Sequence, residues 1–285
     1  MAIIPPFALF VGPTKSGTTW IHAYLAARGD VAMPSQMKET FFFDKVYDRG
    51  FDWYAELFPP EDDTRLRVEV APSLFHKPEA CARAVYHLSH ARVICTVRDP
   101  FDRAVSHYFH YRKRGAPMCS LADMAKTYPD VVEAGLYAAH APRWQAAFGE
   151  ARVHFLSYQL LRNDPETFCR ELCAVLELDY MAPDATLTGT QINAAKVPRN
   201  LAAARLAQSV STGLRRRGAH KVVNLLKHTP IKRWLYSGSQ GLDQERAGIK
   251  RQAPTFSTRL SDDWSAFDQY VAHQSAENGR LEPAP

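Results

Sequence analysis

The feature that most constrains the fold of this chain is an apolar run followed at once by a polar loop and a second apolar stretch. The run covers residues 7–11, the loop residues 12–19, and apolar residues then recur with helical spacing in residues 20–27. A short continuous apolar run is typical of a buried strand, and the Gly-Pro pair after it marks a tight loop. The pattern therefore predicts a strand, a loop and a helix in direct succession.

This loop has the properties of an anion-binding site. A helix that begins directly after a loop offers unpaired N–H groups and the positive end of its dipole. Lys15 adds a positive charge, and the hydroxyls of Ser16, Thr18 and Thr19 lie around Gly17 in the sequence. A phosphate or sulfate group is the ligand that such an arrangement favours.

The loop differs from that of the nucleotide triphosphatases, in which a Lys follows the second Gly and a Ser or Thr follows the Lys. Here Lys15 precedes Gly17, and Thr18 occupies the place of the Lys. A kinase or nucleotide triphosphatase would also need Mg²⁺ ligands, such as an acidic residue at a strand end. The next long apolar strand ends instead in Arg98, so this reaction class remains only an alternative.

Apolar runs and helical patterns alternate as far as residue 178. Further strands are expected at residues 67–70, 92–97 and 153–156, and helices at 78–89, 101–114, 130–148 and 164–178. This alternation predicts an α/β fold with a P-loop-like parallel sheet and helices on both faces. Later helical patterns, at 201–214 and 264–271, flank a basic segment. We expect a nucleotide-binding core in residues 1–179 and a C-terminal helical cap on the substrate side in residues 180–285, within one domain.

Composition and charge are those of an ordinary globular chain, with 285 residues and a net charge of +5. This basic excess suits an anionic donor and is too small to indicate nucleic acid. The five cysteines are scattered and show no zinc-site spacing, so we predict no metal and the reduced thiols of a cytoplasmic protein. No signal peptide or membrane span is predicted.

The loop resembles the 5′-phosphosulfate loop of the sulfotransferases, which use 3′-phosphoadenosine 5′-phosphosulfate (PAPS) as donor. The family pattern is a strand, Pro or Gly, then x-Lys-x-Gly-Thr-Thr-Trp and a helix, and residues 13–20 match it. The resemblance implies that Lys15 binds the donor and acts in catalysis, with residues 16–19 around the phosphosulfate. For Trp20, stacking on the adenine and packing in the core are both open.

A second stretch, residues 98–108, matches the family pattern Arg-Asp-Pro-x-x-Arg-Ala-x-Ser-x-Tyr. Arg98 follows a predicted buried strand, at the sheet edge where α/β proteins bind ligands. The resemblance implies that Arg98 and Ser106 bind the 3′-phosphate of the donor. The alternative for Arg98 is a salt bridge with Asp102 at a helix start, a structural role that suits Arg103 better.

A base that accepts the proton of the acceptor is expected at Glu39. Lys38 and three consecutive Phe residues at 41–43 flank this region, and burial beside them would raise the pKa of its carboxyl. The order Lys-Glu-x-x-Phe-Phe resembles the catalytic-Glu segment of the heparan sulfate and Golgi-type sulfotransferases, as opposed to the soluble enzymes that use a His. The alternatives are His107 or His110 as base, and a purely structural Glu39.

The family's Glu-Lys-x-Pro segment is matched by residues 68–73, except that Val70 stands where a Lys would polarise the sulfate. Lys38 and Lys77 are the candidates to replace that Lys.

Two later stretches resemble the heparan sulfate enzymes. Residues 135–144 match the pattern Gly-x-Tyr followed by Trp, which implies that Tyr137 faces the nucleotide, with core packing as the alternative. Arg199 lies where those enzymes carry a loop that closes over the donor, and we expect it to contact the 3′-phosphate.

The resemblance covers residues 7–178 and implies a bacterial-like, soluble O-sulfotransferase that needs no metal. Its product would be 3′-phosphoadenosine 5′-phosphate (PAP), and its acceptor a hydroxyl of a carbohydrate, glycolipid or small metabolite. The other hypotheses are the kinase or triphosphatase and a non-catalytic nucleotide-binding module. Residues 215–233 are basic with interleaved apolar residues. A lid, a peripheral contact with an anionic membrane and a plain solvated helix are all open for this segment.

Overall fold

The computed structural model describes residues 6–35, 37–59, 65–184, 187, 248–249 and 254–278. The chain divides into two compact units, which are described separately. The first unit comprises residues 1–103, 132–190 and 255–285, and the second comprises residues 104–131 and 191–254. The predicted boundary at residue 179 remains a prediction.

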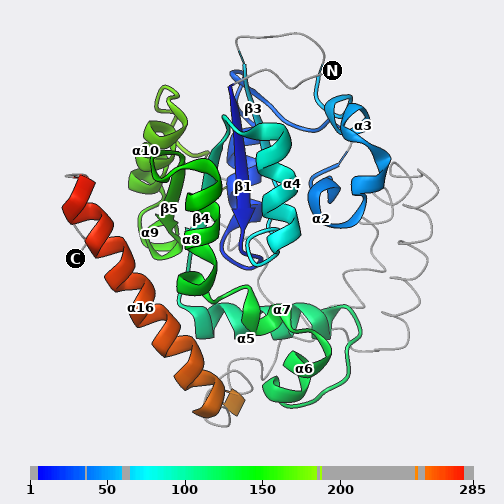
Figure 1. Ribbon diagram of the computed structural model, residues 1–285, viewed down its shortest axis with the longest axis vertical. Coiled ribbons are helices and arrows are strands. Elements are labelled where there is room, and N and C mark those ends of the chain that lie inside the picture. The colour runs from blue at the N-terminus through cyan, green and yellow to red at the C-terminus, as the bar shows by residue number, and fades with distance from the viewer. Residues whose placement is uncertain are drawn as a thin grey trace. The chain divides into compact units, whose positions relative to one another are not determined.

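The described part of the first unit is built on a parallel sheet of five strands in the order β2-β3-β1-β4-β5 (Figure 1). All neighbouring strands pair in parallel. Because parallel strands end at the same edge, the loop after β1 lies between the ends of β3 and β4. The predicted P-loop-like α/β sheet is therefore confirmed. The strands are β1 (Phe7–Gly12), β2 (Val31–Ala32), β3 (Leu66–Val70), β4 (Arg92–Val97) and β5 (Val153–Ser157).

Helices flank both faces of this sheet. Figure 1 shows α4 and α8 in front of the sheet and α1 behind it. The described helices of the first unit are α1 (Thr18–Ala26), α2 (Phe42–Lys45), α3 (Phe51–Ala55), α4 (Pro78–Leu88), α8 (Tyr137–Phe148), α9 (Tyr158–Asn163), α10 (Pro165–Leu176) and α16 (Pro254–Asn278), with 3-10 turns at Tyr47–Arg49 and Glu150–Arg152.

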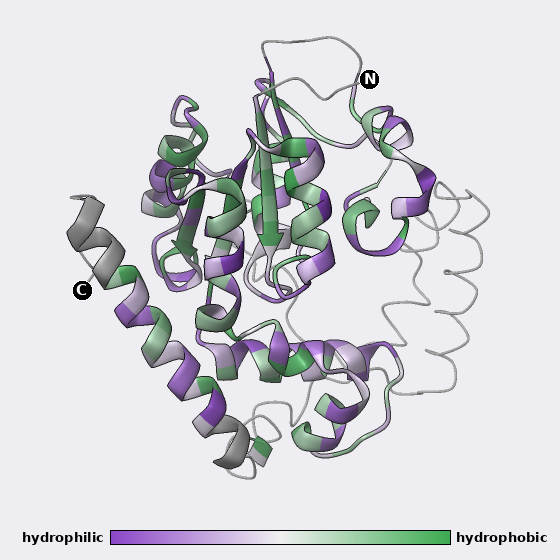
Figure 2. Cartoon of the chain, in the orientation of Figure 1, coloured by the Kyte–Doolittle hydropathy of each residue, from purple (hydrophilic) through white to green (hydrophobic). Residues whose placement is uncertain are grey.

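Strand β1 is buried along its whole length, and Figure 2 shows it as continuously apolar. Leu9 and Val11 join the core cluster that includes side chains of α4 and α8. Side chains alternate across a strand, so Ala8 and Phe10 face the side where α1 packs. Full burial of each large apolar side chain contributes roughly 1.5–3 kcal/mol, which gives the loop after β1 a rigid starting point.

Residues 41–43 form an aromatic wedge, in which Phe42 and Phe43 are each 1% exposed. Phe42 stacks on Tyr54 with ring centroids 4.7 Å apart. Phe41 is only half-buried, adopts a positive φ of 55° and lies under the ammonium of Lys45. The wedge therefore fixes the chain directly after Glu39.

The helix expected over residues 130–148 is interrupted at Gly135, between α7 (Asp130–Glu133) and α8. A Cβ at Gly135 would lie 2.8 Å from Nε of Arg103, so this position needs glycine for close approach. The last helix, α16, is longer than the expected 264–271. It docks on α8, where the carboxylate of Asp263 accepts the N–H groups of Ala138 and Ala139.

The second unit includes the part of α5 (Pro100–Lys113) that follows residue 103, together with α6 (Leu121–Thr127) and the start of α7. Tyr111 donates to both carboxylate oxygens of Asp130, at 3.0 and 2.8 Å, and stacks on Tyr128. These contacts join α5 to the chain around the start of α7, and all three side chains are half-buried.

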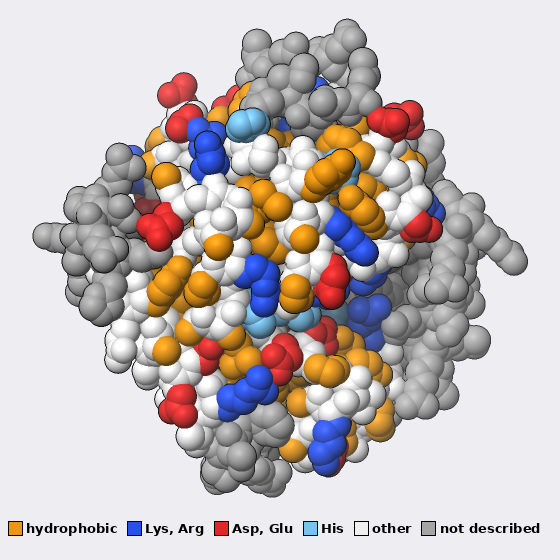
Figure 3. Space-filling view, in the orientation of Figure 1, with side chains coloured by type: hydrophobic (Ala, Val, Ile, Leu, Met, Phe, Trp, Pro, Cys, Tyr) orange, Lys and Arg blue, Asp and Glu red, His pale blue; other side chains and the backbone are white. Residues whose placement is uncertain are grey.

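Acidic and basic side chains are interspersed on the face of the molecule that Figure 3 shows. Within the described ranges, no helix combines the length and the apolar character needed to cross a membrane. The same part of the chain contains no group of three or more potential ligands that could hold a metal ion.

Candidate active site

The loop between β1 and α1 contains three residues with positive φ, a conformation that few residues other than glycine adopt. Gly12, Lys15 and Gly17 have positive φ values of 110°, 78° and 83°. Gly17 is the N-cap of α1, and a Cβ there would lie 2.5 Å from Cδ2 of Leu161. Helix α1 has neither a side-chain cap nor an acidic residue in its first turn. The positive end of this helix is therefore open to an anion.

Two arginines, one after β4 and one in the first turn of α5, bind carbonyl groups of this loop. Arg98 donates from Nη1 to the carbonyl of Lys15 at 2.8 Å, and Arg103 donates to that of Thr14 at 3.3 Å. The N–H and C=O groups of a trans peptide point in opposite directions, so the N–H groups of Lys15 and Ser16 point away from the arginines. For Arg103 a structural role at the helix start was expected, and the structure shows it fully buried and bonded to this loop.

The hydroxyl of Ser16 is a buried polar group that fits an oxyanion ligand. Ser16 is 0% exposed, and its hydroxyl has no hydrogen-bond partner among the described residues. The phenol of Tyr137 is a close polar neighbour. Burial raises the pKa of that phenol and a hydrogen-bonding interaction with Ser16 lowers it, but the pair does not meet standard hydrogen-bond geometry. A buried hydroxyl without a partner costs about 1–3 kcal/mol, and a sulfate or phosphate oxygen in the loop would supply the missing partner.

Tyr137 connects the end of β4 to the core. Its hydroxyl accepts the backbone N–H of Arg98 at 3.0 Å, and its ring contacts Phe75, Trp264 and Phe267. Burial raises the pKa of its phenol, so it stays protonated. Tyr137 is thus packed in the core and also supports Arg98, whose guanidinium lies 4.5 Å from the ring centre of Tyr158. Contact with a nucleotide remains a prediction.

Lys38 and Glu39 belong to the segment before α2, and Lys38 contacts the first turn of α1. The ammonium of Lys38 donates to the hydroxyl of Thr19 at 2.8 Å and lies 3.7 Å from a carboxylate oxygen of Glu39. Burial lowers the pKa of Lys38, and Glu39 opposes this shift. The structure therefore brings the residue predicted as base next to the helix that follows the anion loop.

Lys38 and Lys77 are the candidates to replace the Lys that the family pattern has at position 70, and their surroundings differ. Val70 is fully buried where β3 pairs with Phe10 of β1. Lys77 pairs at 2.6 Å with Asp44, whose side chain is fully buried. Lys38 contacts the helix after the loop, so the geometry favours Lys38 over Lys77.

Helix α1 and the residues just after it bind the chain that follows α10. Trp20 and Tyr24 of α1 donate to the carbonyls of Leu187 and Met181 at 2.9 and 2.6 Å, and Arg28, which follows the helix, donates to that of Asp179 at 2.8 Å. This chain therefore runs along α1 toward the loop. Trp20 is 8% exposed and stacks on Tyr24. Core packing accounts for these contacts, and adenine stacking remains a prediction.

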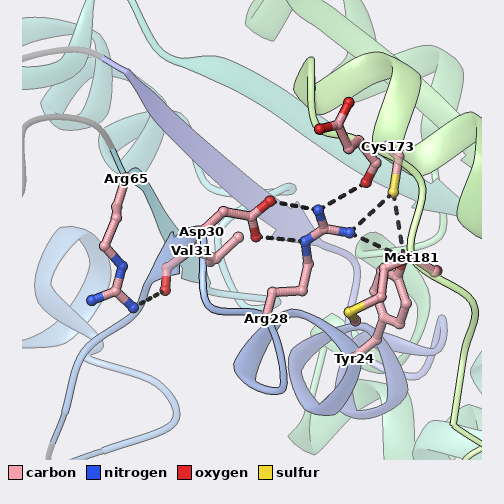
Figure 4. Close-up of polar contacts among 8 residues, drawn as sticks. Tyr24, Arg28, Asp30, Val31, Arg65, Cys173 and Met181 are labelled. Carbon is pink, nitrogen blue, oxygen red and sulfur yellow. Dashed lines mark hydrogen bonds and ion pairs between the residues drawn. The ribbon is translucent and has the colours of Figure 1, made fainter.

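Arg28 links this contact to Asp30 and to α10 (Figure 4). It binds Asp30 through two hydrogen bonds, of 2.8 and 2.6 Å. A further N–H lies 3.4 Å from the sulfur of Cys173 on α10. The side chain of Arg28 is 3% exposed, so these partners compensate for burial of its charge.

The remaining residues predicted for the site are not among those that contact the loop or α1 in the bonds described above. Ser106, half-buried on α5, belongs to the second unit, and its role at the 3′-phosphate remains a prediction. The rival base His107 is 3% exposed and lies 3.6 Å from a carboxylate oxygen of Asp130, while His110 is half-buried on the same helix. Arg199 and the basic segment 215–233 lie outside the described residues.

The parallel sheet and the loop after its central strand define a P-loop-like α/β protein with a candidate anion site. The model of the sulfotransferase domain family matches residues 5–226. The chain therefore belongs to the sulfotransferase family.

Curated relatives include enzymes named for heparan sulfate. Human bifunctional heparan sulfate N-deacetylase/N-sulfotransferase 3 is 31% identical over 194 residues, which cover 59% of this chain and 22% of that protein. Human heparan sulfate glucosamine 3-O-sulfotransferase 3B1 is 30% identical over 169 residues, which cover 56% of this chain and 43% of the relative. The chain thus spans less than half the length of these relatives.

A sulfotransferase from Alicyclobacillus acidocaldarius has the same fold. Its crystal structure aligns with a TM-score of 0.58 at 23% identity, over 82% of this chain and 99% of that one.

Proposed function

We propose that this protein transfers the sulfuryl group of PAPS to an acceptor hydroxyl, with Glu39 as general base. The observation that carries this proposal is the contact of Lys38 with Thr19, which brings Glu39 next to the anion loop. A base beside the site of the phosphosulfate is the arrangement that sulfuryl transfer needs.

In the proposed step the acceptor oxygen attacks sulfur in line with the bridging oxygen of the phosphosulfate. The new O–S bond forms as the bond from sulfur to the bridging oxygen breaks. The acceptor proton passes to the carboxylate of Glu39, and the bridging oxygen keeps the electron pair as part of the phosphate of PAP. The reaction is balanced without a metal or a covalent enzyme intermediate.

The chain supplies positive charge where negative charge develops. Lys15, the N–H groups of the loop and the start of α1 would bind the 5′-phosphosulfate, and Ser16 would donate to one of its oxygens. We assign the charge of the Lys missing at Val70 to Lys38. The side chain of Lys38 is half-buried, so water screens its charge less than at the open surface and its interaction with the developing charge is stronger. Arg98, Ser106 and Arg199 would bind the 3′-phosphate.

The acceptor class is a carbohydrate or another hydroxyl-bearing molecule such as a glycolipid or small metabolite. The relatives are named for N-sulfation and for 3-O-sulfation of heparan sulfate, so an amine acceptor is the first alternative. A cytoplasmic location is part of the proposal, supported by the free thiols of all five cysteines. Peripheral membrane contact would depend on residues 215–233.

The test is release of PAP from PAPS, measured with glucosamine-containing oligosaccharides whose amine is free or acetylated. Wild-type protein is expected to transfer to the acetylated acceptor, with or without a chelator. Glu39→Gln is expected to lose turnover and keep PAP binding. Full activity of Glu39→Gln would exclude Glu39 as base. PAP binding without turnover in the wild type would instead support a non-catalytic module.

A further inference from the structure

Glu69 is a fully buried carboxylate that binds the residue next to the proposed base. It lies in β3 and is 0% exposed. One of its oxygens accepts both the N–H of Thr40, at 3.3 Å, and the hydroxyl of Thr40. The other accepts the hydroxyl of Tyr54 at 2.6 Å. Thr40 directly follows Glu39, so a buried network lies one peptide away from the proposed base.

These hydrogen bonds are what makes burial of Glu69 tolerable. A buried carboxyl is costly unless hydrogen-bonded, and burial raises the pKa of Glu69 while its bonds to Thr40 and Tyr54 lower it. Two of the three bonds come from Thr40. Moving Thr40 away would leave the carboxyl with Tyr54 alone among the donors that the structure shows, so the network holds Thr40 firmly in place.

The network also reaches the wedge and the sheet. The hydroxyl of Thr40 accepts the N–H of Phe42 at 3.1 Å, which fixes the peptides from residue 40 to residue 42. In the sheet, Glu69 pairs with Leu9 of β1, three residues before the loop begins at Gly12. The segment that carries Glu39 is therefore bonded to the strand pair that carries the anion loop.

We propose that Glu69 is a positioning residue of the transfer site. Acting through Thr40, it sets the carboxylate of Glu39 against the first turn of α1 and the phosphosulfate loop. This inference rests on the proposed function, because it assigns Glu69 a role in the same reaction. Misplacement of a reacting group by about 1 Å can lower a rate roughly 100-fold, so the network affects turnover more than donor binding.

The test compares Glu69→Gln and Tyr54→Phe in turnover, PAP binding and hydrogen exchange at the Thr40 amide. Gln keeps the size of Glu but replaces one acceptor oxygen by an NH₂ donor that faces other donors. Tyr54→Phe removes one bond and no charge. Tyr47→Phe is the matched control, because its hydroxyl is bonded in the same aromatic cluster to His87, at 2.9 Å.

The expected result is a fall in kcat of roughly 10- to 100-fold for Glu69→Gln and a smaller fall for Tyr54→Phe. The Kd for PAP should change less than about threefold, and exchange of the Thr40 amide should accelerate in both variants. Tyr47→Phe should keep kcat. Unchanged kcat and unchanged Thr40 exchange in the two variants would overturn the inference while the proposed function stands.

Equal losses of PAP binding and kcat would also overturn it, because they would show a general loss of structure. If Glu69→Gln does not fold, the inference is tested with Tyr54→Phe alone, by kcat, the Kd for PAP and exchange of the Thr40 amide. A wild type that neither binds PAP nor transfers sulfate would contradict the proposed function first, and this inference with it.

Discussion

Arg98 donates a hydrogen bond of 2.8 Å to the carbonyl of Lys15, and so joins the end of β4 to the loop after β1. These two residues were predicted to bind opposite ends of the donor. Their direct contact means that the two sequence motifs form one structure, in which a residue expected at the 3′-phosphate also shapes the loop expected at the 5′-phosphosulfate.

Arg98→Ala is expected to weaken PAP binding. The loss of one charge-assisted hydrogen bond, at about 1.5–3 kcal/mol, corresponds to roughly a 10- to 100-fold rise in Kd. Calorimetry measures this directly. Arg152→Ala is the matched control, because its guanidinium also donates to a backbone carbonyl, that of Phe148 at 3.0 Å. Equal Kd values for the two variants would contradict a role of Arg98 in the donor site.

Gly17→Ala is expected to damage the loop and to abolish PAP binding. Its φ of 83° and the 2.5 Å approach of Leu161 leave no room for a Cβ, and the strain amounts to about 1–3 kcal/mol. Thermal unfolding and PAP titration check this. Gly29→Ala, where the added Cβ meets nothing within 4 Å, should behave as wild type. A Gly17→Ala protein that binds PAP normally would show that the loop is not the anion site.

Lys38→Gln is expected to lower kcat about 100-fold, the usual effect of removing one group that stabilises transition-state charge. Lys38→Arg should recover part of this loss. Lys77→Gln tests the alternative cation, and we expect it to reduce stability through the loss of its pair with Asp44 with a much smaller change in kcat. A larger fall in kcat for Lys77→Gln than for Lys38→Gln would assign the stabilisation of transition-state charge to Lys77.

Stability is expected to fall as the pH decreases from about 6.5 toward 4. Burial lowers the pKa of His22 to about 4 and that of His76 to about 3, with smaller contributions from Lys38 and Lys77 respectively. In this pH window the unfolded chain binds protons that the folded chain does not, so acid favours unfolding, by at most about 1.4 kcal/mol per pH unit and histidine. Urea unfolding at pH 7 and pH 5 measures the slope. His76→Gln should reduce this slope, and an unchanged slope in that variant would contradict the assignment to His76.

Arg28→Met is expected to destabilise the protein by about 1–3 kcal/mol, because it removes the buried bonds to Asp30 and to the carbonyl of Asp179. Arg170→Met serves as control, since the pair of Arg170 with Glu166 is exposed and contributes only about 0.3–0.5 kcal/mol. Urea unfolding compares the two. Equal losses would mean that the contact of α1 with the following chain adds nothing to stability.

The sequence predicted the elements with strong local signals. Strand β4 begins at Arg92 and ends at Val97 as expected, because its apolar run is continuous. Helix α10 begins after Asp164, whose side chain caps it, with Pro165 at its first position. The catalytic role of the Lys-Glu segment rests on the resemblance to the heparan sulfate enzymes and remains a prediction.

The remaining features depend on pairs of residues far apart in the chain. The bond of Thr40 to Glu69 and that of Trp20 to Leu187 join residues separated by 29 and 167 positions. No local pattern encodes these pairs, which are set by tertiary packing. For Glu69 a signal existed, since a charged residue between two valines of a strand predicts a buried partner. The length of α16 escaped prediction because docking of Trp264 and Phe267 on Tyr137 stabilises a helix with few apolar residues.

The central claim, that the loop after β1 binds the donor of a sulfotransferase, is tested most directly by calorimetric titration of the wild-type protein with PAP, with adenosine 5′-phosphate and with ATP plus Mg²⁺. The account predicts tight binding of PAP without metal and much weaker binding of adenosine 5′-phosphate, which lacks the 3′-phosphate. Preference for ATP with Mg²⁺ would contradict it and would favour a kinase or triphosphatase.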